Sequence, residues 1–123
     1  MARVAAAVPL VGALVVAAWL AAVGPDAARA ASFDCTRPAA ADERAVCASR
    51  MLSDEDVRMV TLYDVAVKLV GMGVRGDLRD QQRAFLAARA SCGADAACIA
   101  GLYEQRVASL QKIIDDIAAR GPY

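Results

Sequence analysis

Four cysteines have the most reactive side chains in this 123-residue sequence: Cys35, Cys47, Cys92 and Cys98. A cysteine thiolate can act as a nucleophile, hold a metal ion or be oxidised to a disulfide. The chain has no histidine, and the spacings C-x11-C and C-x5-C match no common zinc module. We therefore expect two disulfides. Sequence alone allows three pairings. We favour Cys35–Cys47 and Cys92–Cys98, because each pair brackets one short helix or one turn.

Other residue types give little support to catalysis. Without histidine, the serines have no evident base beside them to activate a hydroxyl. Asp115 and Asp116 are neighbours in a predicted helix, so their carboxylates point to different faces and do not form an acid–base pair. The thiols are expected to be oxidised. We therefore predict a protein that is not an enzyme and that needs no cofactor and no metal.

Charged side chains also fall on helix faces that should be buried. Apolar residues at spacings of three and four give each predicted helix one inward stripe, and Asp56, Arg89 and Arg106 lie on these stripes. A buried charge is tolerated when it is paired and hydrogen-bonded, and arginine can bind a carboxylate through two bonds. We interpret the set as a structural network that fixes helix register; the alternative is a polar ligand site. The predicted network consists of Glu43, Asp56, Gln82, Arg89 and Arg106.

Helix signals are frequent, whereas strand signals are almost absent because no stretch alternates apolar and polar residues. A short first helix is predicted to open at Thr36-Arg37-Pro38 and to end near Arg50. Short connections make consecutive helices antiparallel neighbours. The prediction is an all-α fold: a small antiparallel bundle of three main helices plus a short N-terminal helix, stapled by two disulfides. The three main helices run from the cap Ser53 to about Val70, from Asp77 to about Cys92, and from the cap Asp95 to about Arg120. Gly93 can take the left-handed conformation in the tight turn before the last helix.

A glycine-rich stretch, residues 71–76, separates two of these helices. Each glycine disfavours helix by about 1 kcal/mol relative to alanine, so we expect an exposed loop. The loop has an apolar tip, Met72 and Val74, beside one base, Arg75. These residues make it a candidate binding loop; the alternative interpretation is a plain linker between helices.

Residues 1–30 have the pattern of a signal peptide: one base at Arg3, an apolar run over 4–23, and an A-x-A cleavage pattern that ends at Ala30. A retained membrane anchor is the alternative, since the run is close to the roughly 20 residues that span a bilayer. No basic stop-transfer cluster follows it. A lipoprotein does not fit, because the charged Asp34 precedes Cys35. We predict a signal peptide over 1–30 and a periplasmic or secreted helical domain over 31–123.

The charge of this predicted domain excludes several classes of partner. The chain has 14 acidic and 14 basic residues, of which one acid (Asp26) and two bases (Arg3 and Arg29) precede residue 31, so the remainder carries a net charge of about −1. Nucleic acids are bound by proteins with a marked basic excess, and an anionic membrane surface needs one too. We expect neither partner, and no stable membrane anchor after cleavage.

One ordered set of residues runs through most of the chain: Phe33-Asp34-Cys35, Glu43-Arg44-Ala45-Val46-Cys47, Leu52, Asp56, Tyr63, Gln82-Arg83-Ala84-Phe85-Leu86, Arg89, Cys92, Cys98, Tyr103 and Arg106. This set resembles the LprI-like family of small secreted bacterial proteins, formerly a domain of unknown function, which is named after a member reported as a lysozyme inhibitor. The resemblance covers about Ser32 to Leu110. The family commonly has tryptophan where this chain has Phe85, and the founding inhibitor is a lipoprotein.

The resemblance implies a helical, disulfide-bonded protein of the cell envelope, with lysozyme as a possible protein partner. Our first hypothesis is a binding domain that inhibits lysozyme, with Arg75 reaching a catalytic carboxylate. The second hypothesis is a structural or adaptor domain that binds another periplasmic protein through a helix face.

Overall fold

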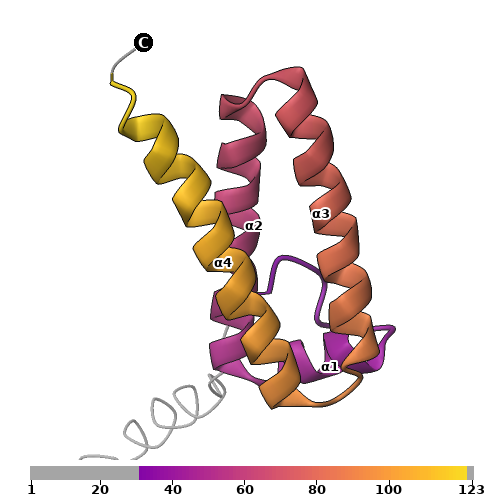
Figure 1. The fold of residues 1–123 in the computed structure, drawn as a ribbon. Coiled ribbons are helices and arrows are strands. Elements are labelled where there is room, and N and C mark those ends of the chain that lie inside the picture. Colours follow the sequence, from indigo (N-terminus) through magenta and orange to yellow (C-terminus); the bar gives the residue numbers. More distant parts are fainter. Residues whose placement is uncertain (1–30, 122–123) are drawn as a thin grey trace, which may run out of the picture.

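The computed structural model describes residues 31–121, and the predicted signal peptide lies outside the described residues. Within 31–121 the chain forms α-helices and no strand, which confirms the all-α prediction. Three long helices run side by side in alternating directions, and a short one lies across the end where α3 turns into α4 (Figure 1). The helices are α1 (Ala41–Ala48), α2 (Arg50–Leu69), α3 (Met72–Ser91) and α4 (Ala96–Ala118).

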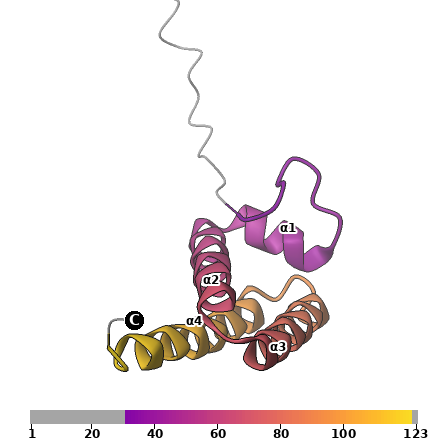
Figure 2. The ribbon, with the colours of Figure 1, turned by 90° about the horizontal axis from the view of Figure 1, so that it is seen from above.

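The predicted inward stripes form a single core. Helices α2 and α4 make the most extensive helix pair, and the C-terminal part of α4 leans away from α3 (Figures 1 and 2). Seen along the bundle, α1 lies beside α2 and α3 (Figure 2). The stripe residues meet along these contacts and exclude water from most of their apolar surface. The largest buried apolar side chains are Leu52, Met59, Leu78, Phe85, Ile99, Tyr103 and Leu110.

Helix α1 begins at Ala41, later than the sequence predicts. The carboxylate of Glu43 accepts hydrogen bonds from the backbone N–H groups of Ala39 (2.8 Å) and Ala40 (3.1 Å). This arrangement satisfies two amides that precede the helix, as a capping-box glutamate does. Pro38 therefore lies before the helix rather than in its first turn.

Helix α2 begins at Arg50, three residues earlier than predicted. The cap is Ser49, the single residue between α1 and α2, whose hydroxyl accepts from the amide of Leu52 at 3.3 Å. Ser53, the predicted cap, is buried, and its hydroxyl donates to the carbonyl of Val46 at 2.8 Å. Ser53 thus satisfies a carbonyl at the end of α1 instead of starting α2.

The predicted loop over residues 71–76 is wrong, because helix α3 starts at Met72 rather than at Asp77. Gly73 and Gly76 lie in its first turns, both exposed. Helix propensity is a weak local preference that tertiary context overrides. Here Val70 and Gly71 suffice to reverse the chain, and the amide of Arg75 bonds to the carbonyl of Gly71 at 2.9 Å.

The turn between α3 and α4 and both disulfides agree with the predictions. Gly93 has a φ of 56°, the left-handed conformation that suits glycine. Asp95 caps α4 by accepting from the amides of Ala97 and Cys98, each at 3.0 Å. The disulfides are Cys35–Cys47 and Cys92–Cys98, with Cα–Cα distances of 5.6 and 5.8 Å.

Candidate functional site

Four polar side chains meet in the interior, one from each helix, and we call them the buried polar cluster: Asp42 of α1, Asp56 of α2, Arg89 of α3 and Tyr103 of α4. The guanidinium of Arg89 donates through Nε to Asp42 at 2.8 Å and through Nη1 to the hydroxyl of Tyr103 at 2.9 Å. Nη1 also lies 3.5 Å from Oδ1 of Asp56. The Tyr103 hydroxyl donates to the same oxygen at 2.8 Å. One arginine thereby joins all four helices.

The sequence predicted two members of this cluster, Asp56 and Arg89, but named the wrong residue of α1. Glu43 is only partly buried and caps α1, whereas its neighbour Asp42 is 3 % exposed and pairs with Arg89. An acid in the first turn of a helix is usually explained by the helix dipole. The available signal was spacing: Asp42 stands four residues before the buried Val46, so both lie on one face.

Tyr103 is not among the residues of the predicted network, but it belongs both to the core and to the buried polar cluster. Its ring packs against Phe85, with centroids 5.3 Å apart and an interplanar angle of 57°. Its hydroxyl lies between Asp56 and Arg89. Burial and the bond to Asp56 raise the pKa of Tyr103. For Arg89, burial alone would lower the pKa, but the pairing with Tyr103 and Asp42 raises it.

We expect Tyr103 to make the fold sensitive to alkali. A raised pKa in the folded state means stability that is complete below the ordinary pKa of tyrosine and is lost as pH rises above it. The Tm should therefore fall steeply as the pH rises above about 10. Tyr103→Phe should lower the free energy of unfolding at neutral pH by about 1–3 kcal/mol, because Asp56 loses a donor, and should flatten the alkaline decline. Tyr63→Phe is the control; an unchanged alkaline decline in Tyr103→Phe would contradict this assignment.

The chain before α1 covers the cluster. The backbone N–H of Ser32 donates to Oδ2 of Asp56 at 2.6 Å, and the ring of Phe33 lies 5.3 Å from the Arg89 guanidinium carbon. The disulfide from Cys35 to Cys47 holds this segment against α1. Because its bonds run between parts of the same chain, the cluster fits the structural interpretation better than a polar ligand site.

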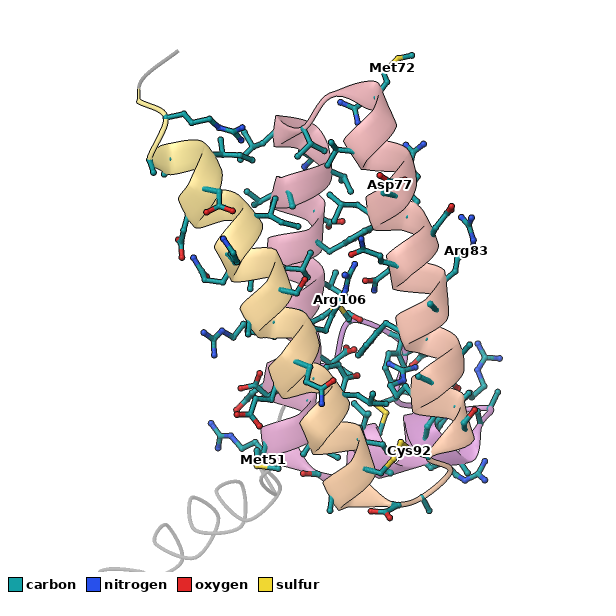
Figure 3. The ribbon with its side chains drawn as sticks, in the orientation of Figure 1. Met51, Met72, Asp77, Arg83, Cys92 and Arg106 are labelled. Atoms are coloured by element: carbon teal, nitrogen blue, oxygen red, sulfur yellow. A yellow bond between two sulfur atoms is a disulfide. The ribbon has the colours of Figure 1, made fainter. Side chains whose placement is uncertain are left out.

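Arg106 and Gln82 do not join the cluster as predicted, but form a separate group that links α4 to α3. The Arg106 side chain lies between these two helices (Figure 3). The Arg106 side chain donates to the side-chain oxygens of Gln82 and Gln81, each at 3.1 Å. Among residues 31–121 it forms no ion pair. Burial lowers the pKa of Arg106, while Tyr63 opposes this effect. The charge is thus satisfied by neutral amides rather than by Glu43 or Asp56.

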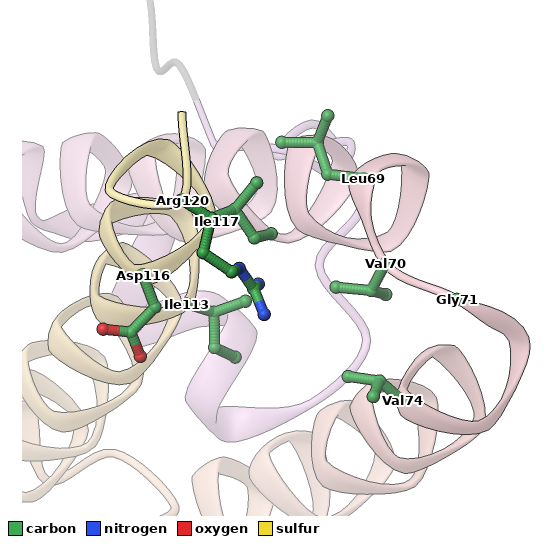
Figure 4. Close-up of a pocket in the computed structure, with 8 residues that line it drawn as sticks. All are labelled: Leu69, Val70, Gly71, Val74, Ile113, Asp116, Ile117 and Arg120. Carbon is green, nitrogen blue, oxygen red and sulfur yellow. The ribbon is translucent and has the colours of Figure 1, made fainter. Parts of the chain in front are cut away.

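At the opposite end of the bundle from Cys92, the α2–α3 connection and the C-terminal part of α4 enclose an apolar groove, which we call the tip groove (Figures 3 and 4). Its volume is about 480 Å³. The guanidinium of Arg120 points across it toward Val70 and Val74, while the Asp116 carboxylate points away (Figure 4). The residues that line it are Leu69, Val70, Gly71, Val74, Ile113, Asp116, Ile117 and Arg120.

The three residues of the predicted binding loop lie in different surroundings at this tip. Met72 and Val74 are exposed, at 85 % and 51 %, on the first turn of α3. Arg75 is only partly exposed, because its guanidinium folds back and donates to the carbonyl of Val70 at 3.0 Å. Met72 and Val74 thus lie at the surface, whereas the Arg75 side chain satisfies a backbone carbonyl at the end of α2.

Comparison with known proteins gives no relative: no family model, no curated protein and no solved structure matches this chain. Membership of the LprI-like family therefore stays a prediction from the residue pattern. Over the described part of the chain, no group of cysteine, aspartate and glutamate side chains is arranged to hold a metal ion. None of α1 to α4 is long and apolar enough to cross a membrane.

Proposed function

We propose that this chain is an exported, disulfide-stapled binding domain and that the tip groove receives a protein partner. The observation that carries the proposal is the concentration of exposed apolar side chains at this end of the bundle. Leu69 and Val74, which line the groove, and Met72, which lies next to it at the start of α3, are each at least half exposed. A contiguous apolar surface with a polar rim is characteristic of an interaction site on a small soluble domain.

The residue types at the tip favour a protein ligand. Methionine is flexible and polarisable, so Met72 can adapt to an irregular partner surface. Arg120 supplies one cation beside the apolar walls, and among residues 31–121 it forms no ion pair. A side chain of the partner that combines an apolar body with a carboxylate would satisfy both features.

We further propose lysozyme as the partner, and this step rests on the resemblance to the LprI-like family. Lysozyme cleaves its substrate with two carboxyl groups in an open cleft. In this proposal Arg120 replaces Arg75 as the cation that reaches such a carboxylate, since Arg75 is held against Val70. A net charge of about −1 for the mature chain gives little long-range attraction, so local contacts at the tip must supply the affinity.

The test is a titration of purified exported protein against lysozyme, read as cell-wall lysis and as binding by calorimetry. We expect Met72→Glu to weaken binding at least about tenfold, because a buried carboxylate would replace an apolar anchor at the interface. The Tm of Met72→Glu should stay near that of the parent, since the Met72 side chain is exposed. Met51→Glu is the matched control, because Met51 is also an exposed methionine and lies at the opposite end of the bundle from Met72 (Figure 3).

Two results would contradict the proposal. Lysis that continues unchanged at a large excess of the protein would exclude lysozyme as the partner. A stoichiometric partner recovered from periplasmic extract, bound equally by the parent and by Met72→Glu, would exclude the tip groove and would favour an adaptor domain that uses another helix face.

A further inference from the structure

The charges of the buried polar cluster do not balance. Two carboxylates, Asp42 and Asp56, are 3 % and 1 % exposed, and one guanidinium, that of Arg89, faces both. Tyr103 adds a hydroxyl that is neutral over the physiological range, since tyrosine ionises only near pH 10 and burial raises its pKa further. The cluster therefore has one negative charge in excess. An uncompensated charge this deep in a protein is strongly unfavourable.

Space and further negative charge lie beside the cluster. A cavity of about 430 Å³ is lined by Asp42, Asp56 and Arg89 of the cluster, by Ser32 and Phe33, and by Glu43. No lysine lines this cavity, and Arg89 is its one basic residue. The site is thus arranged for a second cation, which the side chains around the cavity do not supply.

We propose that this cation is the α-amino group of Ala31, created when a signal peptidase cleaves the Ala30–Ala31 bond. The inference rests on the export proposed above, not on the identity of the partner. Hydrolysis adds one water: Ala30 leaves with the new carboxylate, and Ala31 keeps the nitrogen as an amine that takes up a proton near neutral pH. Before cleavage the same nitrogen is a neutral amide. Removal of the leader thereby completes the charge balance of the core.

The position of the N-terminal segment supports this assignment. The amide nitrogen of Ser32 lies 2.6 Å from Oδ2 of Asp56, and consecutive backbone nitrogens are separated by less than a Cα–Cα step of about 3.8 Å. The nitrogen of Ala31 is therefore within roughly 6 Å of that carboxylate. Ala31 is partly buried and packs against the core. The titratable and charged groups around this position are Asp34, Asp42, Glu43, Asp56, Arg89 and Tyr103.

The experiment uses the exported product of the full chain with Lys68→Arg and Lys112→Arg, both exposed positions, so that the α-amine is the only primary amine after cleavage. Mass spectrometry should show that the product begins at Ala31. Acetylation then removes the charge of the amine. We expect acetylation to lower Tm by about 4–8 °C near pH 6. The difference should narrow near pH 10, where the free amine also loses its charge.

A direct titration of the α-amine by NMR should place its pKa above the ordinary range, because the carboxylates favour the protonated form. A product that begins at another residue would overturn the proposal. So would equal Tm values before and after acetylation, or a Tm loss of the same size at both pH values, which would assign the effect to the bulk of the acetyl group. The acetylation experiment does not involve lysozyme, so failure of the lysozyme proposal is distinguishable from failure of the α-amine proposal.

Discussion

Replacing Arg89 by methionine is expected to lower the free energy of unfolding by about 3–5 kcal/mol, the range measured when one partner of a buried ion pair is removed. Methionine fills much of the space of the aliphatic stem, but it leaves Asp42 and Asp56 buried without the guanidinium that faces both. Tyr103 also loses the guanidinium that donates to its hydroxyl. Unfolding in urea, with the slope checked for two-state behaviour, measures the change.

The matched control is Arg83→Met on the same helix. Arg83 pairs with Asp80 at the surface, where both side chains are largely exposed. Exposed ion pairs contribute about 0–1 kcal/mol, so this variant should unfold within that range of the parent. If Arg89→Met folded as stably as the parent and lost only partner binding, the buried polar cluster would be a ligand site and not a structural network.

The second large effect is expected on removal of the Cys35–Cys47 disulfide by a double change to serine. The bridge closes a loop with a sequence separation of 12, and loss of a constraint of this size costs about 3 kcal/mol by the loop-entropy relation. The same bridge holds Ser32 and Phe33 over the cluster, so their contacts with Asp56 and Arg89 should weaken as well. The Tm values of the parent and of the double-serine variant, both measured without reductant, test this expectation.

The Cys92–Cys98 bridge supplies the internal control. It closes a shorter loop, with a sequence separation of 6, so its removal should cost less, about 2 kcal/mol. Asp95 and Gly93 also keep this turn in place without the bridge. A larger loss for the Cys92–Cys98 variant than for the Cys35–Cys47 variant would contradict the assignment of residues 31–34 as cover for the cluster.

The sequence by itself determined the features that depend on neighbouring residues. The spacing of apolar residues predicted the inward stripes, including the buried Asp56, Arg89 and Arg106. Local cysteine spacing predicted both disulfides, and Gly93 with Asp95 predicted the last turn. These signals are short-range, because capping, turn conformation and helix periodicity each act within a few residues.

Tertiary structure alone decided which of these groups meet. Helix crossing brings Arg89 to Asp42 and Tyr103, while Arg106 receives neutral glutamine partners. In the same packing α3 begins at Met72 and includes two glycines in its first turns. The tip groove lies where the C-terminal part of α4 diverges from α3 (Figure 1). Charge pairing depends on a few ångströms between helices that are distant in sequence, and local spacing does not specify such a distance. The partners of buried charges therefore emerge only when the four helices pack.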